Sequence, residues 1–270
     1  MYNLKIITSG DRVEIYKISN YLINESKEDP GHKMIKELLE NIEDKQQEGE
    51  ENKQTKQDRI KTLTKARNNI IRLIRCNTDM QTFITLTFAK ELDYKESKAK
   101  LNIFFTKLRK RYKQLKYLWV LEYGDKNKRL HYHVLCNIPI EINLSSSREE
   151  KTEDHKKLEQ EFNKLYWNNG FVDIRHLGKE DNSNIALYVS TYIVKSLQDT
   201  ELEGYRIYGY SHRTLNKPVE DKFYSIDKID VILSKYKDYE VCYTSSYAIG
   251  YQNWKGNHEG NVTYIDLIKK

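Results

Sequence analysis

The chain has 270 residues, of which 38% are hydrophobic, so it can bury one core of ordinary size and still have material left for extensions. Lys and Arg outnumber Asp and Glu by 46 to 40, and the resulting net charge of +6 favours a polyanionic partner without establishing one. The 3 cysteines are far apart and no apolar run reaches about 18 residues, which argues against a disulfide framework, a zinc site and a membrane partner, so we expect a cytoplasmic protein.

Residues 1–58 are expected to form an N-terminal appendage with a charged linker. Two short apolar stretches within 4–24, separated by Ser9-Gly10-Asp11, predict a hairpin, and a helix is expected over about 34–42. Residues 43–59 contain no apolar side chain, which indicates a linker, a disordered loop or a solvated helix. Apolar residues then recur at helical spacing over 60–74 with basic residues between them, and this amphipathic helix either packs with a solvated back or faces DNA.

The main domain is expected over residues 59–218. The alternating F-I-T-L-T-F at 83–88 predicts a strand with one buried face, and Asp93 and Glu96 have capping-box spacing at the start of an amphipathic helix. The other predicted elements are, in order, strands at 118–123 and 130–136 that pair antiparallel, a surface loop at 145–157, a helix from Leu158 that ends at a left-handed glycine at 170, and a strand at 171–177.

The order strand, helix, strand, strand, helix, strand predicts an α+β fold with a central antiparallel sheet, helices on one face and a polar face left open. Residues 219–270 are expected to form a C-terminal β-rich extension. Tyrosines recur there every four residues from 239 to 251, which indicates a hairpin with aromatic cross-strand pairs.

His131-Tyr132-His133 lies in one of the two paired strands. Alternate side chains of a strand share a face, so both imidazoles point the same way and can chelate one divalent ion. Glu122 is the only charge in the neighbouring strand, and it would complete a three-ligand site with open positions. Taken alone, the pattern also fits a surface strand with solvated or hydrogen-bonded histidines and a solvated Glu122.

A later segment, 184–197, places Tyr188, Tyr192 and Lys195 at i, i+4 and i+7, on one side of a predicted helix. Core packing is the alternative for the two tyrosines. Together with the histidines, however, these are the parts needed for phosphodiester cleavage by a protein hydroxyl. A metal would polarise the phosphate, a tyrosine would attack phosphorus, and the lysine would orient the phosphate or lower the cost of phenoxide.

Three motifs resemble, in order, those of the HUH endonucleases of rolling-circle replication. They are F-I-T-L-T-F at 83–88, L-H-Y-H-V-L at 130–135 and Y-V-S-T-Y-I-V-K at 188–195. The third is similar to the two-tyrosine form of phage and plasmid initiators, although Thr191 stands where a lysine often precedes the second tyrosine. The stretch S-H-R-T-L-N-K-P at 211–218 resembles a basic segment found downstream in such initiators.

The resemblance implies a replication initiator that nicks single-stranded or hairpin origin DNA, forms a 5′-phosphotyrosine and a free 3′-hydroxyl, and later rejoins strands. It implies a ferredoxin-like core and Mg²⁺ or Mn²⁺ held by His131 and His133, with Glu122 as third ligand. Tyr192 is the expected nucleophile, because its spacing to Lys195 is the Y-x-x-K of single-tyrosine enzymes. Tyr188 would be a second nucleophile or a positioning group.

Arg109, Lys110, Arg213 and Lys217 are the expected DNA-binding cations. No G-x-x-x-x-G-K-[ST] occurs, so a host helicase and polymerase would act on the nicked product. Within the same chemistry, a transposase or a mobilisation nickase remains an alternative. A different alternative is a non-catalytic single-stranded nucleic-acid-binding protein, since the 21 tyrosines and the basic side chains could stack on bases and neutralise phosphates without cutting.

Overall fold

The computed structural model describes residues 1–19, 52–124, 129–144, 151–177, 188–189, 191, 205–253 and 256–270. They form two compact units: one takes its residues from 1–76 and 217–270, and the other from 77–216. The predicted helix over 34–42 lies outside the described residues. The domain boundaries expected near 58 and 218 stay a prediction.

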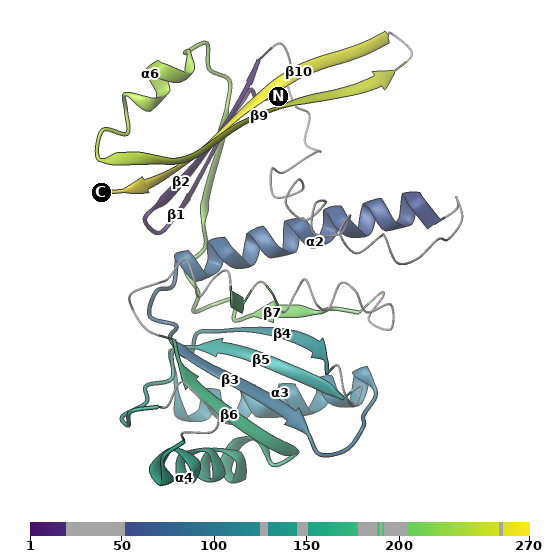
Figure 1. The fold of residues 1–270 in the computed structure, drawn as a ribbon, viewed down its shortest axis with the longest axis vertical. Helices are drawn as coiled ribbons and strands as arrows, with labels where there is room; N and C mark the ends of the chain where they lie inside the picture. Colours follow the sequence, from purple (N-terminus) through teal and green to yellow (C-terminus); the bar gives the residue numbers. More distant parts are fainter. Residues whose placement is uncertain are drawn as a thin grey trace. The chain divides into compact units, whose positions relative to one another are not determined.

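The unit within 77–216 contains one five-stranded antiparallel sheet with the strand order β6-β3-β5-β4-β7 (Figure 1). Its first six regular elements repeat the β-α-β-β-α-β order of ferredoxin-like folds, and the predicted α+β class is confirmed. The elements are β3 (Thr82–Phe88), α3 (Tyr94–Arg111), β4 (Tyr117–Tyr123), β5 (Leu130–Cys136), α4 (Glu153–Phe162) with the π-helix η1 (Asn163–Trp167), β6 (Gly170–His176) and β7 (Tyr208–Tyr210).

The alternation of β3 divides the sheet into an apolar and a polar face, as predicted. Ile84, Leu86 and Phe88 are buried against the apolar side chains of α3 and α4, whereas Thr85 and Thr87 point to the opposite face. Burying each such aliphatic or aromatic side chain contributes about 1.5–3 kcal/mol, so the core fixes which residues of every strand face the helices. The polar face of the sheet is therefore set by the register of its apolar face.

Two local predictions in this unit are corrected by the structure. The expected loop at 145–157 is partly helical, because α4 begins at Glu153, where the Thr152 hydroxyl accepts a hydrogen bond from the backbone N–H of His155. The left-handed residue that ends the following helix is Asn168, with φ 50°, and not the glycine at 170. Asparagine tolerates this conformation because its short polar side chain can hydrogen-bond locally.

The other unit is also built on a five-stranded antiparallel sheet, with the strand order β8-β1-β2-β10-β9. The predicted N-terminal hairpin is confirmed, and its turn contains Gly10 with φ 62°, a conformation that suits glycine. The elements are β1 (Leu4–Ser9), β2 (Arg12–Ser19), α2 (Asn52–Arg75), β8 (Val219–Phe223), α6 (Ile229–Leu233), β9 (Tyr239–Asn253) and β10 (Gly256–Lys269).

Both faces of this second sheet carry apolar side chains. Val13 and Ile15 pack with Ile232 of α6 on one face, while Tyr16 and Ile18 belong to a separate cluster. The segment at 239–251, expected to be a hairpin by itself, is one long strand whose hairpin partner is β10. The hairpin could not be confined to the tyrosine repeat, since the apolar positions of both strands extend well beyond it.

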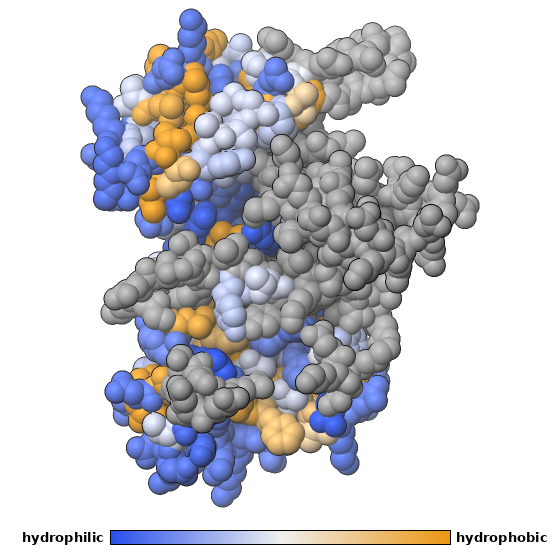
Figure 2. Space-filling model, viewed as in Figure 1, coloured by the Kyte–Doolittle hydropathy of each residue, from blue (hydrophilic) through white to orange (hydrophobic). Residues whose placement is uncertain are grey.

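Hydropathy is unevenly distributed over the visible surface (Figure 2). Hydrophobic residues gather in a strip over the part of the N- and C-terminal unit where Figure 1 draws α6. Exposed apolar residues of that unit include Val219, Ile226, Val231 and Val241. Within the described part of the chain, none of the helices combines the length and the apolar composition needed to cross a membrane.

Candidate functional site

The two histidines of β5 lie on the sheet face opposite α3 and α4. His131 is opposite Thr87 on β3 and Glu122 on β4, and His133 is opposite Thr85 on β3. We call these five residues the histidine face. Four of them come from the central strands β3 and β5, which are hydrogen-bonded on both sides, so the backbone that carries the imidazoles is rigid.

A threonine hydroxyl contacts the Nδ1 atom of each imidazole. Thr87 Oγ1 lies 2.9 Å from His131 Nδ1, and Thr85 Oγ1 lies 3.2 Å from His133 Nδ1. Each pair is directly cross-strand, so the same register that buries Ile84 and Leu86 also brings the hydroxyls to the rings. Metal-binding histidines commonly hydrogen-bond through the nitrogen that does not bind the ion, and these contacts orient both rings in that manner.

Glu122 approaches His133 from β4. Its Oε2 atom is 2.7 Å from His133 Nε2, and both side chains are buried. An ionised carboxylate can only accept a hydrogen bond, so Nε2 carries a proton in this arrangement. A neutral His133 then accepts at Nδ1 from the Thr85 hydroxyl. A hydroxyl can also accept from Nδ1–H, so Thr85 can serve either tautomer of the ring.

Gly124 allows the His131 ring to occupy its position at the end of β4. A Cβ atom at residue 124 would lie 2.5 Å from His131 Nε2, and 3.0 Å from Cδ2 of the same ring. Real Cβ atoms do not make contacts this short, so any side chain here would displace the imidazole. The glycine follows β4 and its N–H donates to the carbonyl of Arg129, which closes the β4–β5 hairpin.

Two imidazoles and a carboxylate are a suitable donor set for a divalent ion. As they stand, the residues described contain no group of three His, Cys, Asp or Glu side chains that could hold a metal. Glu122 is close to the histidines, as predicted, but it hydrogen-bonds to His133. The donor chemistry fits a metal, and the assignment of His131, His133 and Glu122 as ligands stays a prediction.

Tyr188 is the part of the predicted tyrosine pair that the structure describes. Its ring packs edge-on against Phe83, with centroids 5.3 Å apart, and Phe83 in turn stacks on His133 at 5.7 Å. Tyr188 is 41% exposed and helical, as is Thr191. The phenol therefore lies on the same side of the sheet as the imidazoles. Tyr192 and Lys195 lie outside the described residues.

The four predicted DNA-binding cations lie apart from the histidine face. Arg109 and Lys110 are exposed on α3, which covers the opposite side of the sheet, and Arg109 donates to the Tyr117 hydroxyl. Arg213 follows β7 in a segment whose Thr214 bonds to the Leu115 carbonyl, beyond the end of β4 that is remote from Glu122. Lys217 is exposed and belongs to the other compact unit. Their roles in DNA binding stay predictions.

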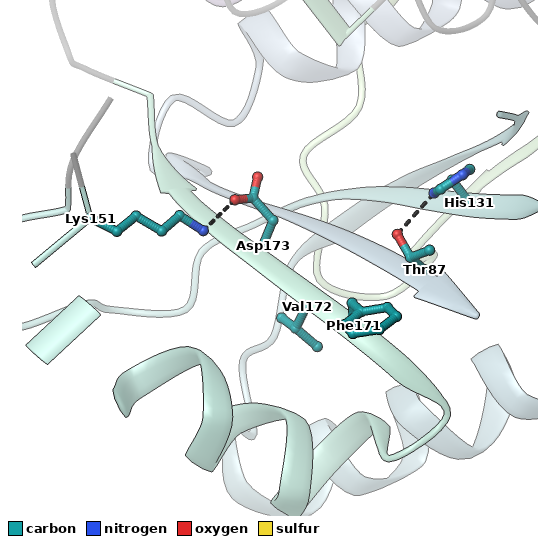
Figure 3. Close-up of a pocket in the computed structure, with 6 residues that line it drawn as sticks. All are labelled: Thr87, His131, Lys151, Phe171, Val172 and Asp173. Carbon is teal, nitrogen blue, oxygen red and sulfur yellow. Dashed lines mark hydrogen bonds and ion pairs between the residues drawn. The ribbon is translucent and has the colours of Figure 1, made fainter. Parts of the chain in front are cut away.

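A pocket adjoins the histidine face, and sequence reasoning did not find it. In Figure 3, Lys151 reaches Asp173 at one end of the pocket, while Thr87 and His131 lie at the other. Its lining residues are Thr87, His131, Lys151, Phe171, Val172 and Asp173. The signal in the sequence was the alternation of Phe171 and Asp173 in a predicted strand, but only the pairing of β6 with β3 brings them beside the histidines.

Residues 81–197 match a family model of replication-associated proteins, the ORF2 type. The match begins at the residue before β3 and includes the whole histidine face and Tyr188, although it covers less than half of the chain. It supports a role as a replication initiator. Neither the curated proteins nor the solved structures gave a significant match.

Proposed function

We propose that the chain is a replication initiator that nicks single-stranded origin DNA through a tyrosine nucleophile in a metal-dependent reaction. The family match over 81–197 is the premise. One observation carries the chemistry: Tyr188 packs on Phe83, which stacks on His133, so a phenol and the imidazole pair share one side of the sheet. A phosphate there would contact both.

Residues of the histidine face would prepare the site. His131, His133 and Glu122 would hold Mg²⁺ or Mn²⁺, which would polarise the phosphate oxygens and stabilise charge that develops on them. Thr85 and Thr87 hold the two rings at Nδ1, which leaves Nε2 as the ligating atom of each. The strand backbone keeps both rings in place while DNA binds and leaves.

The tyrosine supplies the covalent step. Its phenol oxygen forms a bond to phosphorus as the bond between phosphorus and the 3′ oxygen breaks. The phenol proton passes to solvent, and the leaving oxygen takes up a proton to become a free 3′-hydroxyl that can prime synthesis. Attack by that hydroxyl, or by another one, on the phosphotyrosine reverses the step and rejoins strands.

Tyr192 is proposed as the first nucleophile and Tyr188 as the second. Lys195 would lie one helical turn beyond Tyr192, where an ammonium lowers the cost of forming phenoxide. Thr191 contains no charge, so Lys195 would be the cation of this helix that serves the reaction. A host helicase and polymerase would extend the freed end.

Incubation with labelled single-stranded DNA and Mn²⁺ tests the proposal, with covalent complexes resolved on a denaturing gel. Wild type should form an adduct and release an end that a polymerase can extend. Tyr188→Phe combined with Tyr192→Phe should abolish the adduct, whereas Tyr224→Phe, at an exposed tyrosine of the other unit, should not. Unchanged cutting by the double variant would reject the nucleophiles.

A second candidate is a single-stranded nucleic-acid-binding protein without catalysis. The exposed Phe171 beside the histidine face favours it, because an aromatic ring on a sheet stacks on bases whether or not a bond is cut. In that case both tyrosine substitutions would leave every measurable property of the protein intact. The adduct assay therefore separates the two candidates.

A further inference from the structure

We propose that the pocket beside His131 binds one nucleobase, stacked on Phe171, from the nucleotide next to the phosphate at the histidine face. The proposal rests on the proposed function, since it takes single-stranded DNA as the ligand of that face. It adds a binding subsite with a stated chemistry: a flat, neutral aromatic ring with polar edges.

Phe171 is placed to serve as a stacking platform. It lies on the edge strand β6, in the same row across the sheet as Thr87 and His131, and its side chain is 64% exposed. Two strand spacings, roughly 10 Å, separate its backbone from that of His131. A sugar and its base can bridge this distance from a phosphate at the imidazoles.

The pocket itself is of suitable size. It has a volume of about 340 Å³, which lies within the range of small-molecule sites. Phe171 forms an apolar wall, while Lys151 and Asp173 provide polar groups along the same side of β6 (Figure 3). This combination of one aromatic surface and a few polar atoms is the usual lining of a ligand site.

The charges around the pocket favour a base over a phosphate. Lys151 bonds to Glu159 at 2.6 Å and to Asp173 at 2.5 Å, and Arg175 bonds to Asp173 at 3.0 Å. Two cations are thus balanced by two carboxylates. Burial alone would raise the pKa of Asp173, but Lys151 and Arg175 hold it below its ordinary value, so the balance persists at neutral pH. A phosphate would find no net positive charge here.

The polar groups can still read a base. Asp173 accepts and Lys151 donates hydrogen bonds, and the edges of the four bases differ in their donors and acceptors. Single-stranded bases expose these edges, so stacking on Phe171 would present one of them to the Lys151–Asp173 pair. The subsite therefore provides affinity through the ring and base preference through the ion pair.

Fluorescence anisotropy with the full chain in EDTA tests the platform without any cutting. The probe is a labelled single-stranded oligodeoxynucleotide of about 16 nucleotides and mixed sequence. Phe171→Ala should raise Kd roughly tenfold or more, and Phe171→Trp should keep Kd close to that of wild type. The matched control is Leu165→Ala, which removes an equally exposed apolar side chain (62%) from η1, on the other side of the sheet.

Ultraviolet crosslinking of the same oligonucleotide, with iodouracil in place of thymine, should attach a base to the peptide that contains Phe171. Equal affinities for Phe171→Ala and Leu165→Ala, or crosslinks confined to other peptides, would overturn the subsite. An adduct formed by wild type in Mn²⁺ with unaltered Phe171→Ala affinity would reject only this inference. Binding that depends on Phe171 without any adduct would instead reject the nicking reaction and keep the subsite.

Discussion

Glu122 Oε2 lies 2.7 Å from His133 Nε2, although the residue directly opposite Glu122 in the sheet is His131. The carboxylate therefore reaches diagonally across the β4–β5 pair to the more buried imidazole. This contact pre-assembles two of the three proposed ligands. It also means that an ion which binds Nε2 must displace the proton that Glu122 now accepts.

Glu122→Gln should weaken Mn²⁺ binding by at least about tenfold, since an amide is a poorer ligand than a carboxylate and carries no charge. Isothermal titration with Mn²⁺ measures the change, and the adduct assay should show a parallel loss. The matched control is Glu141→Gln, at an exposed position outside the histidine face. Equal Mn²⁺ affinity in both variants would remove Glu122 from the ligand set.

Thr87→Val removes the hydroxyl from His131 while it keeps the shape of the side chain. Loss of such an orienting hydrogen bond should lower metal affinity or adduct yield by about 10- to 100-fold. Thr87→Ser retains the hydroxyl and should restore most of the loss. Titration with Mn²⁺ compares the three proteins; if valine and serine behave alike, the hydroxyl does not orient the ring.

Gly124→Ala should impair the site with little effect on folding. The added methyl group would meet the end of the His131 side chain, which can rotate away and so relieve the contact. We expect the melting temperature to stay close to that of wild type while Mn²⁺ binding and adduct formation fall strongly. A variant with full activity would show that the imidazole does not need its present position.

Part of this site could be predicted from the sequence, because the strand period alone places His131 and His133 on one face. The pairing of β4 with β5 was also predictable, since few residues separate them. The threonine contacts were not, because they join residues 44 and 48 positions apart in the chain. Phe171 likewise gains its meaning only when β6 pairs with β3, and no local pattern determines that register.

The stability of the N- and C-terminal unit should fall at acid pH through Glu14. Glu14 is buried and bonds to Arg72 and Tyr16. Burial alone would raise its pKa, but the hydrogen bond and charge of Arg72 outweigh that effect and lower it. A lowered folded-state pKa contributes stability above the unfolded-state pKa, and this contribution is lost as pH falls through the folded value.

Glu14→Gln should therefore lower the unfolding free energy at pH 7 by about 3 kcal/mol, because it leaves Arg72 unpaired, and it should flatten the decline between about pH 5 and pH 3. Thermal unfolding across this pH range measures both effects. Glu153→Gln, in the exposed pair with Lys156, is the control and should change little. Equal pH profiles for wild type and Glu14→Gln would contradict the assignment.

The fold of this unit was less accessible to sequence reasoning than the ferredoxin-like core. The hairpin of β1 and β2 was predictable from its apolar stretches and its glycine turn. The pairing of β2 with β10 was not, because the two strands lie at opposite ends of the chain and Arg12 bonds to Asp266, 254 positions away. Local periodicity identifies strands but carries no information about so distant a partner.

Peptide mapping of the protein–DNA complex tests the central proposal most directly. Wild type incubated with single-stranded DNA and Mn²⁺ is digested with protease and nuclease, and mass spectrometry locates the attached nucleotide. We predict that the nucleotide is attached to Tyr192, and to Tyr188 when Tyr192 is replaced by phenylalanine. A nucleotide on any other residue, or a protein that never acquires one, would contradict the proposed reaction.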